Sequence, residues 1–148
     1  MQLVVLGLNH KTVPVDIREQ FAISPDSARS GLIHLDEQEG IEEAVVLSTC
    51  NRTEIYAVLK DETAKETLYD FFLALSGNSE AKDEYFFYFE GEACIRHLFE
   101  VVSGLDSMVI GESQILNQIK TAYTMALEEK ATRTILNTLF HRAIRTGK

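Results

Sequence analysis

The segments Glu43-Ala-Val-Val-Leu-Ser48 and Thr53-Glu-Ile-Tyr-Ala-Val-Leu59 decide how this sequence folds. Both are short and rich in Val, Ile and Tyr, and only a brief polar stretch separates them. This pattern is typical of a β-hairpin. An apolar run from Leu3 to Leu8 precedes the hairpin and predicts a buried strand, and Tyr85 to Phe89 predicts a fourth strand after it.

Helical patterns connect these strands. Ser24-Pro25-Asp26 supplies an N-cap, a proline at the first helical position and an early acid, and predicts a helix that Gly40 closes. The apolar stripe from Ala64 to Leu75 predicts a second helix, which Gly77 ends. The first ninety residues therefore predict the order β-α-β-β-α-β, a ferredoxin-like antiparallel sheet with helices on one face.

The second part of the chain carries helical patterns alone. Apolar residues recur at spacings of three and four up to Gly104, again from Ile115 to Leu127, and again from Ile135 to Ile144. We therefore expect an α+β fold: one domain, 1–148, in which an α/β sandwich half over 1–90 is followed by an all-helical subdomain over 91–148.

The composition excludes several classes of protein. Hydrophobic residues make up 45% and charged residues 25%, as in a folded globular domain. The apolar runs are far shorter than the about 20 residues of a membrane helix, and the N-terminus lacks the basic stretch of a signal peptide, so we expect a cytoplasmic protein without a membrane partner. The net charge of −9 argues against general nucleic-acid binding, although Lys130–Lys148 alone carries +5. No metal is expected, because two cysteines and four scattered histidines have no metal-ligand spacing.

The turn between the two hairpin strands is the most promising place for chemistry. It carries Cys50 where an exposed residue is expected, although cysteine is usually buried. Arg52, two residues on, favours the nucleophilic thiolate or pairs with a substrate carboxylate. Thr49, Asn51 and the loop amides are candidate donors to an oxyanion. A purely structural cysteine in a tight turn is the alternative.

Two residues of the following helix also stand out. Cys94 is expected to be a small core residue, because apolar neighbours flank it. His97 shares a helix face with Cys94 and Val101, which suits either a core histidine or a proton shuttle near neutral pH. No glycine-rich dinucleotide or triphosphate loop occurs anywhere in the sequence.

Four blocks of the sequence resemble the glutamyl-tRNA reductase family, and they occur in the family's order over nearly the whole chain. They are Gly7-Leu-Asn-His-Lys-Thr12, Ser48-Thr-Cys-Asn-Arg-Thr-Glu54, Gly104-Leu-Asp-Ser-Met-Val-Ile-Gly-Glu-Ser-Gln-Ile-Leu116 and Leu136-Asn-Thr-Leu-Phe140.

The resemblance implies a function. The family reduces glutamyl-tRNA with NADPH to glutamate-1-semialdehyde, the first step of five-carbon tetrapyrrole (porphyrin and haem) biosynthesis. Cys50 would be the nucleophile that holds glutamate as a thioester, and His97 matches the family's activity-supporting histidine. The positions that match the family's substrate-binding residues are Thr49, Asn51, Arg52, Ser107, Glu112, Ser113, Gln114 and Gln118.

The family's enzymes are longer than this chain. A nicotinamide-binding domain and a dimerisation domain follow the catalytic domain, so we expect a truncated catalytic domain with no NADPH site and no homodimer interface of its own. Such a domain would form and hydrolyse the thioester without reducing it, while the whole enzyme would hand its product to glutamate-1-semialdehyde aminomutase. Asn117 stands where the family usually has glycine.

Three other functions stay open at this stage. A ferredoxin-like regulatory or binding module would share the first half of the chain without needing Cys50. A cysteine hydrolase of another family would use the thiol on small esters. A tRNA-binding appendage would bind through Lys130–Lys148.

Overall fold

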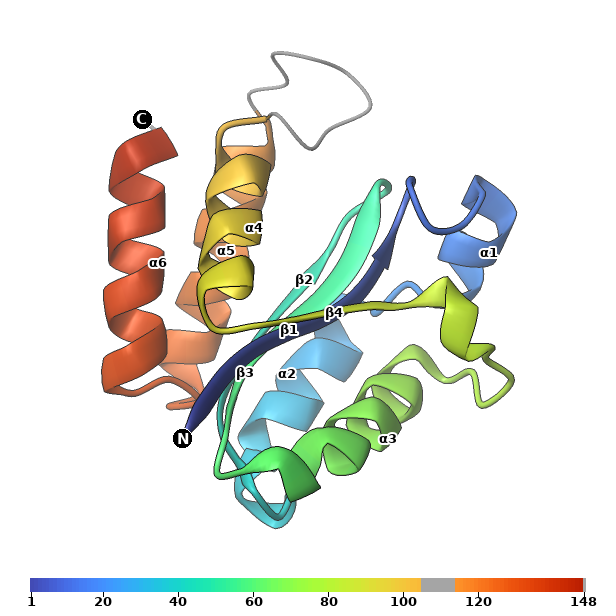
Figure 1. Cartoon of the computed structure of the whole chain (residues 1–148), viewed down its shortest axis with the longest axis horizontal. Coiled ribbons are helices and arrows are strands. Elements are labelled where there is room, and N and C mark those ends of the chain that lie inside the picture. Colours follow the sequence, from blue (N-terminus) through green and yellow to red (C-terminus); the bar gives the residue numbers. More distant parts are fainter. Residues whose placement is uncertain (105–113, 148) are drawn as a thin grey trace.

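A four-stranded antiparallel sheet forms the centre of the molecule. In the computed structural model, which describes residues 1–104 and 114–147, the strands are β1 (Gln2–Asn9), β2 (Ile41–Ser48), β3 (Arg52–Leu59) and β4 (Phe87–Glu90). Their order is β2-β3-β1-β4, and every neighbouring pair is antiparallel. The predicted mixture of helices with an antiparallel sheet is confirmed, and so is the β2–β3 hairpin (Figure 1).

Two helices cover one face of the sheet, α2 (Pro25–Ile33) and α3 (Lys65–Ser76). The Ser24 hydroxyl caps α2 by accepting the Ser27 N–H at 3.1 Å, as its sequence pattern predicted. The helix ends at Ile33 instead of continuing to Gly40, and a single turn of 3₁₀ helix, Leu35–Glu37, follows it. α3 ends as expected, because Gly77 adopts the left-handed conformation with φ 72°.

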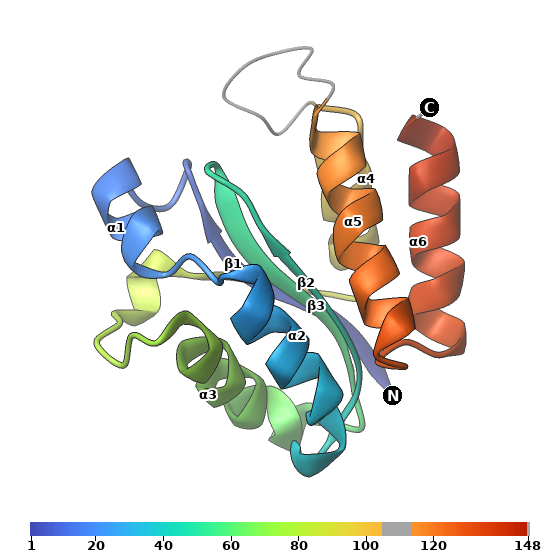
Figure 2. The ribbon, with the colours of Figure 1, turned by 180° about the vertical axis from the view of Figure 1, so that it is seen from behind.

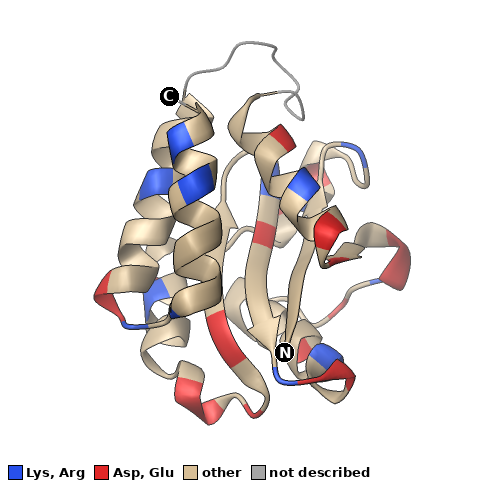
Figure 3. Cartoon of the chain, turned by 60° about the vertical axis from the view of Figure 1, so that its left-hand side comes forward, with Lys and Arg blue, Asp and Glu red and all other residues tan. Residues whose placement is uncertain are grey.

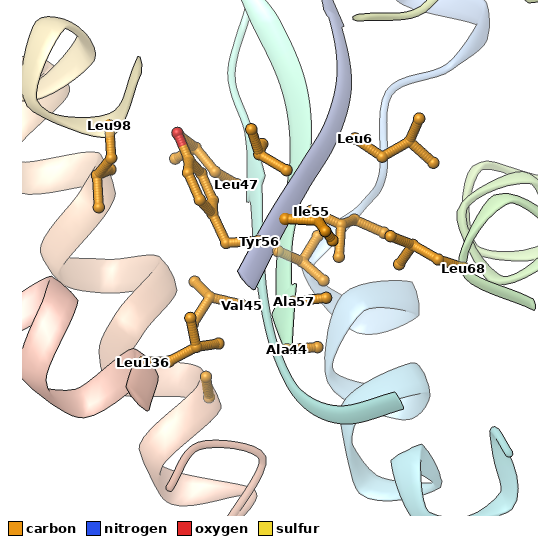
Figure 4. Packing of buried hydrophobic residues seen from close by; sticks show 14 of the residues in the cluster. Leu6, Ala44, Val45, Leu47, Ile55, Tyr56, Ala57, Leu68, Leu98 and Leu136 are labelled. Atoms are coloured by element: carbon orange, nitrogen blue, oxygen red, sulfur yellow. The ribbon is translucent and has the colours of Figure 1, made fainter. Parts of the chain in front are cut away.

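Three further helices cover the opposite face: α4 (Glu92–Val102), α5 (Gln114–Glu128) and α6 (Thr134–Gly147) (Figures 1 and 2). Figure 4 shows Leu6 and Leu68 packed on the α3 side of the sheet, with Tyr56, Leu98 and Leu136 on the other side. Both faces are therefore buried, and the two helical layers share one hydrophobic core through the sheet. No helix of the described residues is long and apolar enough to cross a membrane.

The structure contains a helix that the sequence did not predict. α1 (Val15–Gln20) follows β1 directly, and it is too short to show a clear apolar period. The fourth strand is also shorter than predicted, because β1 pairs with β4 only from Val4 to Gly7. Tyr85 ends a 3₁₀ turn instead, and the Phe86 ring packs edge-to-face on Phe21 and Phe72 at 5.8 and 5.3 Å.

One buried carboxylate ties the second helical layer to the sheet. Glu43 on β2 is 2% exposed, and its Oε1 accepts the backbone N–H groups of Arg133 at 2.6 Å and Leu136 at 2.9 Å. These groups belong to the first turn of α6 and the residue before it, where helix N–H groups lack partners within the helix. Glu43 therefore caps α6 from the neighbouring strand and fixes where this helix starts.

Candidate active site

Cys50 lies at the tip of the β2–β3 hairpin, in a connection of three residues that ends where Arg52 begins β3. It is exposed, as the sequence predicted, whereas Cys94 is buried. Figures 1 and 2 place this tip at the same end of the molecule as α1, the end of α4 and the beginning of α5. The hairpin tip therefore shares this end of the molecule with parts of several other elements.

Hydrogen bonds hold the hairpin tip in one conformation. The Thr49 N–H donates to the Arg52 carbonyl at 2.8 Å, and the Asn51 N–H donates to Thr49 Oγ1 at 3.1 Å. From outside the hairpin, the His10 N–H donates to the Asn51 carbonyl at 3.2 Å. A nucleophile on such a turn keeps its position, which favours reaction with a substrate bound beside it.

The unpredicted helix α1 contributes a further contact to this turn. Arg18 Nε donates to the Cys50 carbonyl at 3.2 Å, and its Nη1 donates to the Val13 carbonyl at 2.9 Å. Arg18 is only 9% exposed. Sequence reasoning missed this residue, because nothing in its local pattern indicates that it reaches a hairpin far along the chain.

Arg52 occupies a different environment from the one predicted for it. It was expected to favour the Cys50 thiolate or to pair with a substrate carboxylate, but it is 1% exposed. Its Nη1 forms an ion pair with Glu54 Oε2 at 3.0 Å. Because residues i and i+2 of a strand point to the same face, both side chains lie under the helical layer of α4, α5 and α6.

Glu54 is the centre of a buried polar cluster that also contains His97. His97 Nε2 on α4 lies 2.8 Å from Glu54 Oε2, and the Tyr56 hydroxyl donates to Glu54 Oε1 at 2.7 Å. The rings of Phe87 and Phe89 pack at 4.9 and 5.3 Å from the His97 ring. The structure thus brings together two residues predicted separately, Arg52 and His97, through a carboxylate to which the sequence analysis gave no role.

The cluster determines which of its members carry charge. Burial alone raises the pKa of Glu54, but the hydrogen bond and charge of His97, then Arg52 and the Tyr56 hydroxyl, outweigh it and hold this pKa below its ordinary value. Burial and then the Glu54 charge raise the pKa of Tyr56 well above its ordinary value. Burial and the same charge raise the pKa of Cys94 to about 12, so this thiol stays neutral.

Gly7 makes room for this cluster. It pairs with Glu54 across the β1–β3 ladder. A Cβ atom at Gly7 would lie 2.8 Å from Glu54 Cγ, 2.8 Å from the Thr53 carbonyl and 2.9 Å from Phe87 Cζ. Only glycine allows so close an approach, which gives a physical reason for the first of the four sequence blocks.

The remaining predicted substrate-binding residues divide into two groups. Gln114 and Gln118 lie on α5 and line a groove of about 510 Å³ that also includes Ser48, the last residue of β2. Ser107, Glu112 and Ser113 lie outside the described residues.

Figure 3 shows Lys and Arg on the surface of α6, where Arg142 and Arg145 are exposed.

Comparison with known proteins then identifies the family. A family model described as "Glutamyl-tRNAGlu reductase, N-terminal domain" matches residues 6–148. The chain belongs to the glutamyl-tRNA reductase family. It is similar to the glutamyl-tRNA reductase of Rubrobacter xylanophilus, at 46% identity over 100% of this chain and 35% of that protein. The enzyme of an Exiguobacterium species is 47% identical over 100% of this chain and 34% of its own length.

A solved structure of a glutamyl-tRNA reductase agrees with the family assignment. The enzyme from Methanopyrus kandleri matches 98% of this chain with a TM-score of 0.80 and 33% identity, and the match covers 33% of that chain. The chain therefore spans about a third of the length of the glutamyl-tRNA reductases it matches. The resemblance inferred from the four sequence blocks is confirmed.

The nicotinamide cofactor of a glutamyl-tRNA reductase does not fit the described part of this chain. Sheets that bind dinucleotides are mostly parallel and open a crevice at the carboxyl ends of their strands, whereas all neighbouring strands here are antiparallel. The sequence also lacks a glycine-rich phosphate loop. Within residues 1–104 and 114–147, no three His, Cys, Asp or Glu side chains are grouped to hold a metal ion.

Proposed function

We propose that this chain carries out the acyl-transfer step of a glutamyl-tRNA reductase, with Cys50 as the nucleophile. The Cys50 thiolate attacks the carbonyl carbon of the glutamyl ester, and a carbon–sulfur bond forms. The carbon–oxygen bond to the ribose breaks, and the tRNA hydroxyl that leaves takes up the proton that the thiol lost. The observation that carries this proposal is an exposed cysteine held by its neighbours at the tip of a turn.

The neighbouring residues have distinct proposed roles. Thr49 and Asn51 flank the thiol and would bind the substrate there, together with Gln114 and Gln118 on α5. We propose that His97 supports catalysis through its buried pair with Glu54, either as a base or by positioning its neighbours. Arg52 is proposed to fix the base of the turn and to supply positive charge toward the substrate carboxylate from within the fold.

The whole enzyme is proposed to complete the reaction elsewhere. NADPH would supply the hydride that converts the thioester into glutamate-1-semialdehyde, the first step of tetrapyrrole biosynthesis. The described residues of this chain do not fit this cofactor, so none of them is assigned a role in the hydride transfer. We further propose a cytoplasmic homodimer that passes its product to an aminomutase. We interpret the strand order as a ferredoxin-like unit to which 91–148 add a helical subdomain.

The test is a search for the covalent intermediate. The chain is incubated with glutamyl-tRNA, quenched in acid and measured by intact mass spectrometry, beside the variants Cys50→Ser and Cys94→Ala. We expect a glutamyl adduct on the unmodified chain and on Cys94→Ala, and none on Cys50→Ser. Released glutamate is counted in parallel, because water would hydrolyse the thioester slowly. Binding of glutamyl-tRNA with neither adduct nor released glutamate would favour a binding module without catalysis.

A further inference from the structure

A groove beside the nucleophile has a lining that suits a particular part of the substrate. It lies between the start of α2, the end of β2 and one side of α5, and its volume of about 510 Å³ is in the usual range of ligand pockets. Its apolar lining comes from all three elements. The residues that line it are Ile23, Pro25, Ala28, Val46, Leu47, Ser48, Gln114, Asn117, Gln118, Thr121, Ala122 and Met125.

The charge of the groove limits what it binds. None of the described residues that line it is charged, and its polar groups are amides and hydroxyls. A carboxylate or a phosphate would lose its hydration there without gaining a cation, which is unfavourable. A flat, neutral ring with hydrogen-bonding edges fits better, because apolar walls contact its faces while side-chain amides contact its edge.

The position of the groove relative to Cys50 indicates which ring this is. Ser48 lines the groove and is two residues from Cys50, so their Cα atoms are at most about 7 Å apart. Along α5, the lining from Gln114 to Met125 extends about 16 Å, which is long enough for a nucleoside. An aminoacyl ester is attached to the ribose of the 3′-terminal adenosine of tRNA, so the adenine lies one ribose away from the reacting carbonyl.

We propose that this groove binds the 3′-terminal adenine of the tRNA, an inference that rests on the proposed function. Three amides of α5 line the groove, those of Gln114, Asn117 and Gln118, and Asn or Gln side chains read adenine by accepting from N6 and donating to N7. Ala28, Leu47 and Met125 supply the apolar contact for the ring. The groove thereby places the ester at the Cys50 turn.

Adenine also occurs in NADPH, which gives a second source for the same ligand chemistry. The adenosine of NADPH carries a 2′-phosphate, and the groove has no cationic side chain among its described residues to bind it. The terminal adenosine of tRNA has no phosphate at this position. The charge of the groove therefore favours the tRNA.

The test compares two small esters that differ only in the base, 3′-O-glutamyl-adenosine and 3′-O-glutamyl-uridine. Acylation of Cys50 is followed by mass spectrometry at substrate concentrations below saturation. We expect the adenosine ester to react about tenfold faster, the discrimination typical of a paired amide. Ala122→Phe, which fills the groove, and Asn117→Ala, at an exposed position, should bring the two rates close together. Ala74→Phe, on an exposed position of α3, should keep the tenfold ratio.

A binding measurement separates the failure of the groove from the failure of the proposed function. The methyl resonance of Met125 is recorded with adenosine, with uridine and with 2′,5′-ADP, and we expect adenosine to shift it most. Equal rates for the two esters in the unmodified chain, with no shift by adenosine, would overturn the groove assignment while leaving the Cys50 chemistry intact. A shift by adenosine without any adduct would support the groove and reject the proposed function. A larger shift by 2′,5′-ADP would overturn the assignment to tRNA.

Discussion

Replacing Glu54 by glutamine tests the buried cluster directly, because Glu54 contacts Arg52, Tyr56 and His97. The substitution keeps the size of the side chain but removes the negative charge that faces Arg52 at 3.0 Å and His97 at 2.8 Å. Glu54 is 0% and Arg52 1% exposed, so water does not replace the lost carboxylate. Breaking a buried ion pair by removing one partner costs about 3–5 kcal/mol, a large part of the roughly 5–15 kcal/mol that stabilises a domain.

Urea unfolding followed by circular dichroism measures this loss. With an unfolding slope of about 2 kcal/mol per molar, we expect the midpoint of Glu54→Gln to fall by roughly 2 M. Removing both members of the Arg52–Glu54 pair, by Arg52→Met with Glu54→Leu, should recover only the part of that stability that the unpaired Arg52 costs, because His97 and the Tyr56 hydroxyl still lose their acceptor. Glu66→Gln, at an exposed position of α3, is the matched control and should shift stability by less than about 0.5 kcal/mol.

The pH dependence of the loss follows from the direction of the Glu54 pKa shift. The folded state holds this pKa below the ordinary value of 4.5, so the carboxylate stabilises the fold fully above about pH 4.5. That stabilisation is lost as the pH falls through the lower pKa of the folded state. The difference between the unmodified chain and Glu54→Gln should therefore be largest near neutral pH and shrink in acid. A loss under about 1 kcal/mol at pH 7, or one that grows in acid, would refute this reasoning.

Three other predictions concern single residues. In the native chain only the Cys50 thiol should react with Ellman's reagent, and Cys94 should react only in denaturant, because Cys94 is 0% exposed. Two fast-reacting thiols in the native state would contradict the burial of Cys94. Glu43→Ala should cost about 1–3 kcal/mol in urea unfolding, because two N–H groups at the start of α6 lose their acceptor, and an unchanged midpoint would show that the cap is dispensable. In the same urea unfolding, Gly7→Ala should lower the free energy of unfolding by about 1–3 kcal/mol, because its Cβ crowds Glu54. Gly91→Ala should lower it only through the backbone, because a Cβ there meets nothing within 4 Å and only the φ of 56° disfavours alanine.

The secondary structure could largely be predicted from local patterns. The hairpin strands, the Ser24-Pro25 start of α2 and the Gly77 end of α3 follow from periodicity, capping and turn chemistry, which act over a few residues. The errors also have a local cause. α1 is too short to show a period, and Phe86 has strand propensity but packs against Phe21 and Phe72 instead of pairing with β1.

The candidate site could be predicted only in part. Cys50 at an exposed turn was correctly predicted, because the hairpin pattern places the turn and the residue type supplies the chemistry. Arg52 was singled out as a partner of the thiol or of a substrate carboxylate, but its side chain is buried and pairs with Glu54. On an antiparallel sheet, polar side chains at every second residue usually face solvent. The alternating polar residues Arg52 and Glu54 therefore predict a solvent-exposed face, although the two side chains form a buried ion pair.

By itself, the sequence determined the order of the strands and of the longer helices, the position of the exposed cysteine and membership of the family, because each depends on residues adjacent in the chain. Only the tertiary structure decided that a second helical layer buries the polar face of β3, that His97 reaches Glu54 from α4, and that Arg18 holds the Cys50 turn. These contacts join residues separated by 43 and 32 positions. Their formation depends on how the layers pack, and no local pattern specifies that packing.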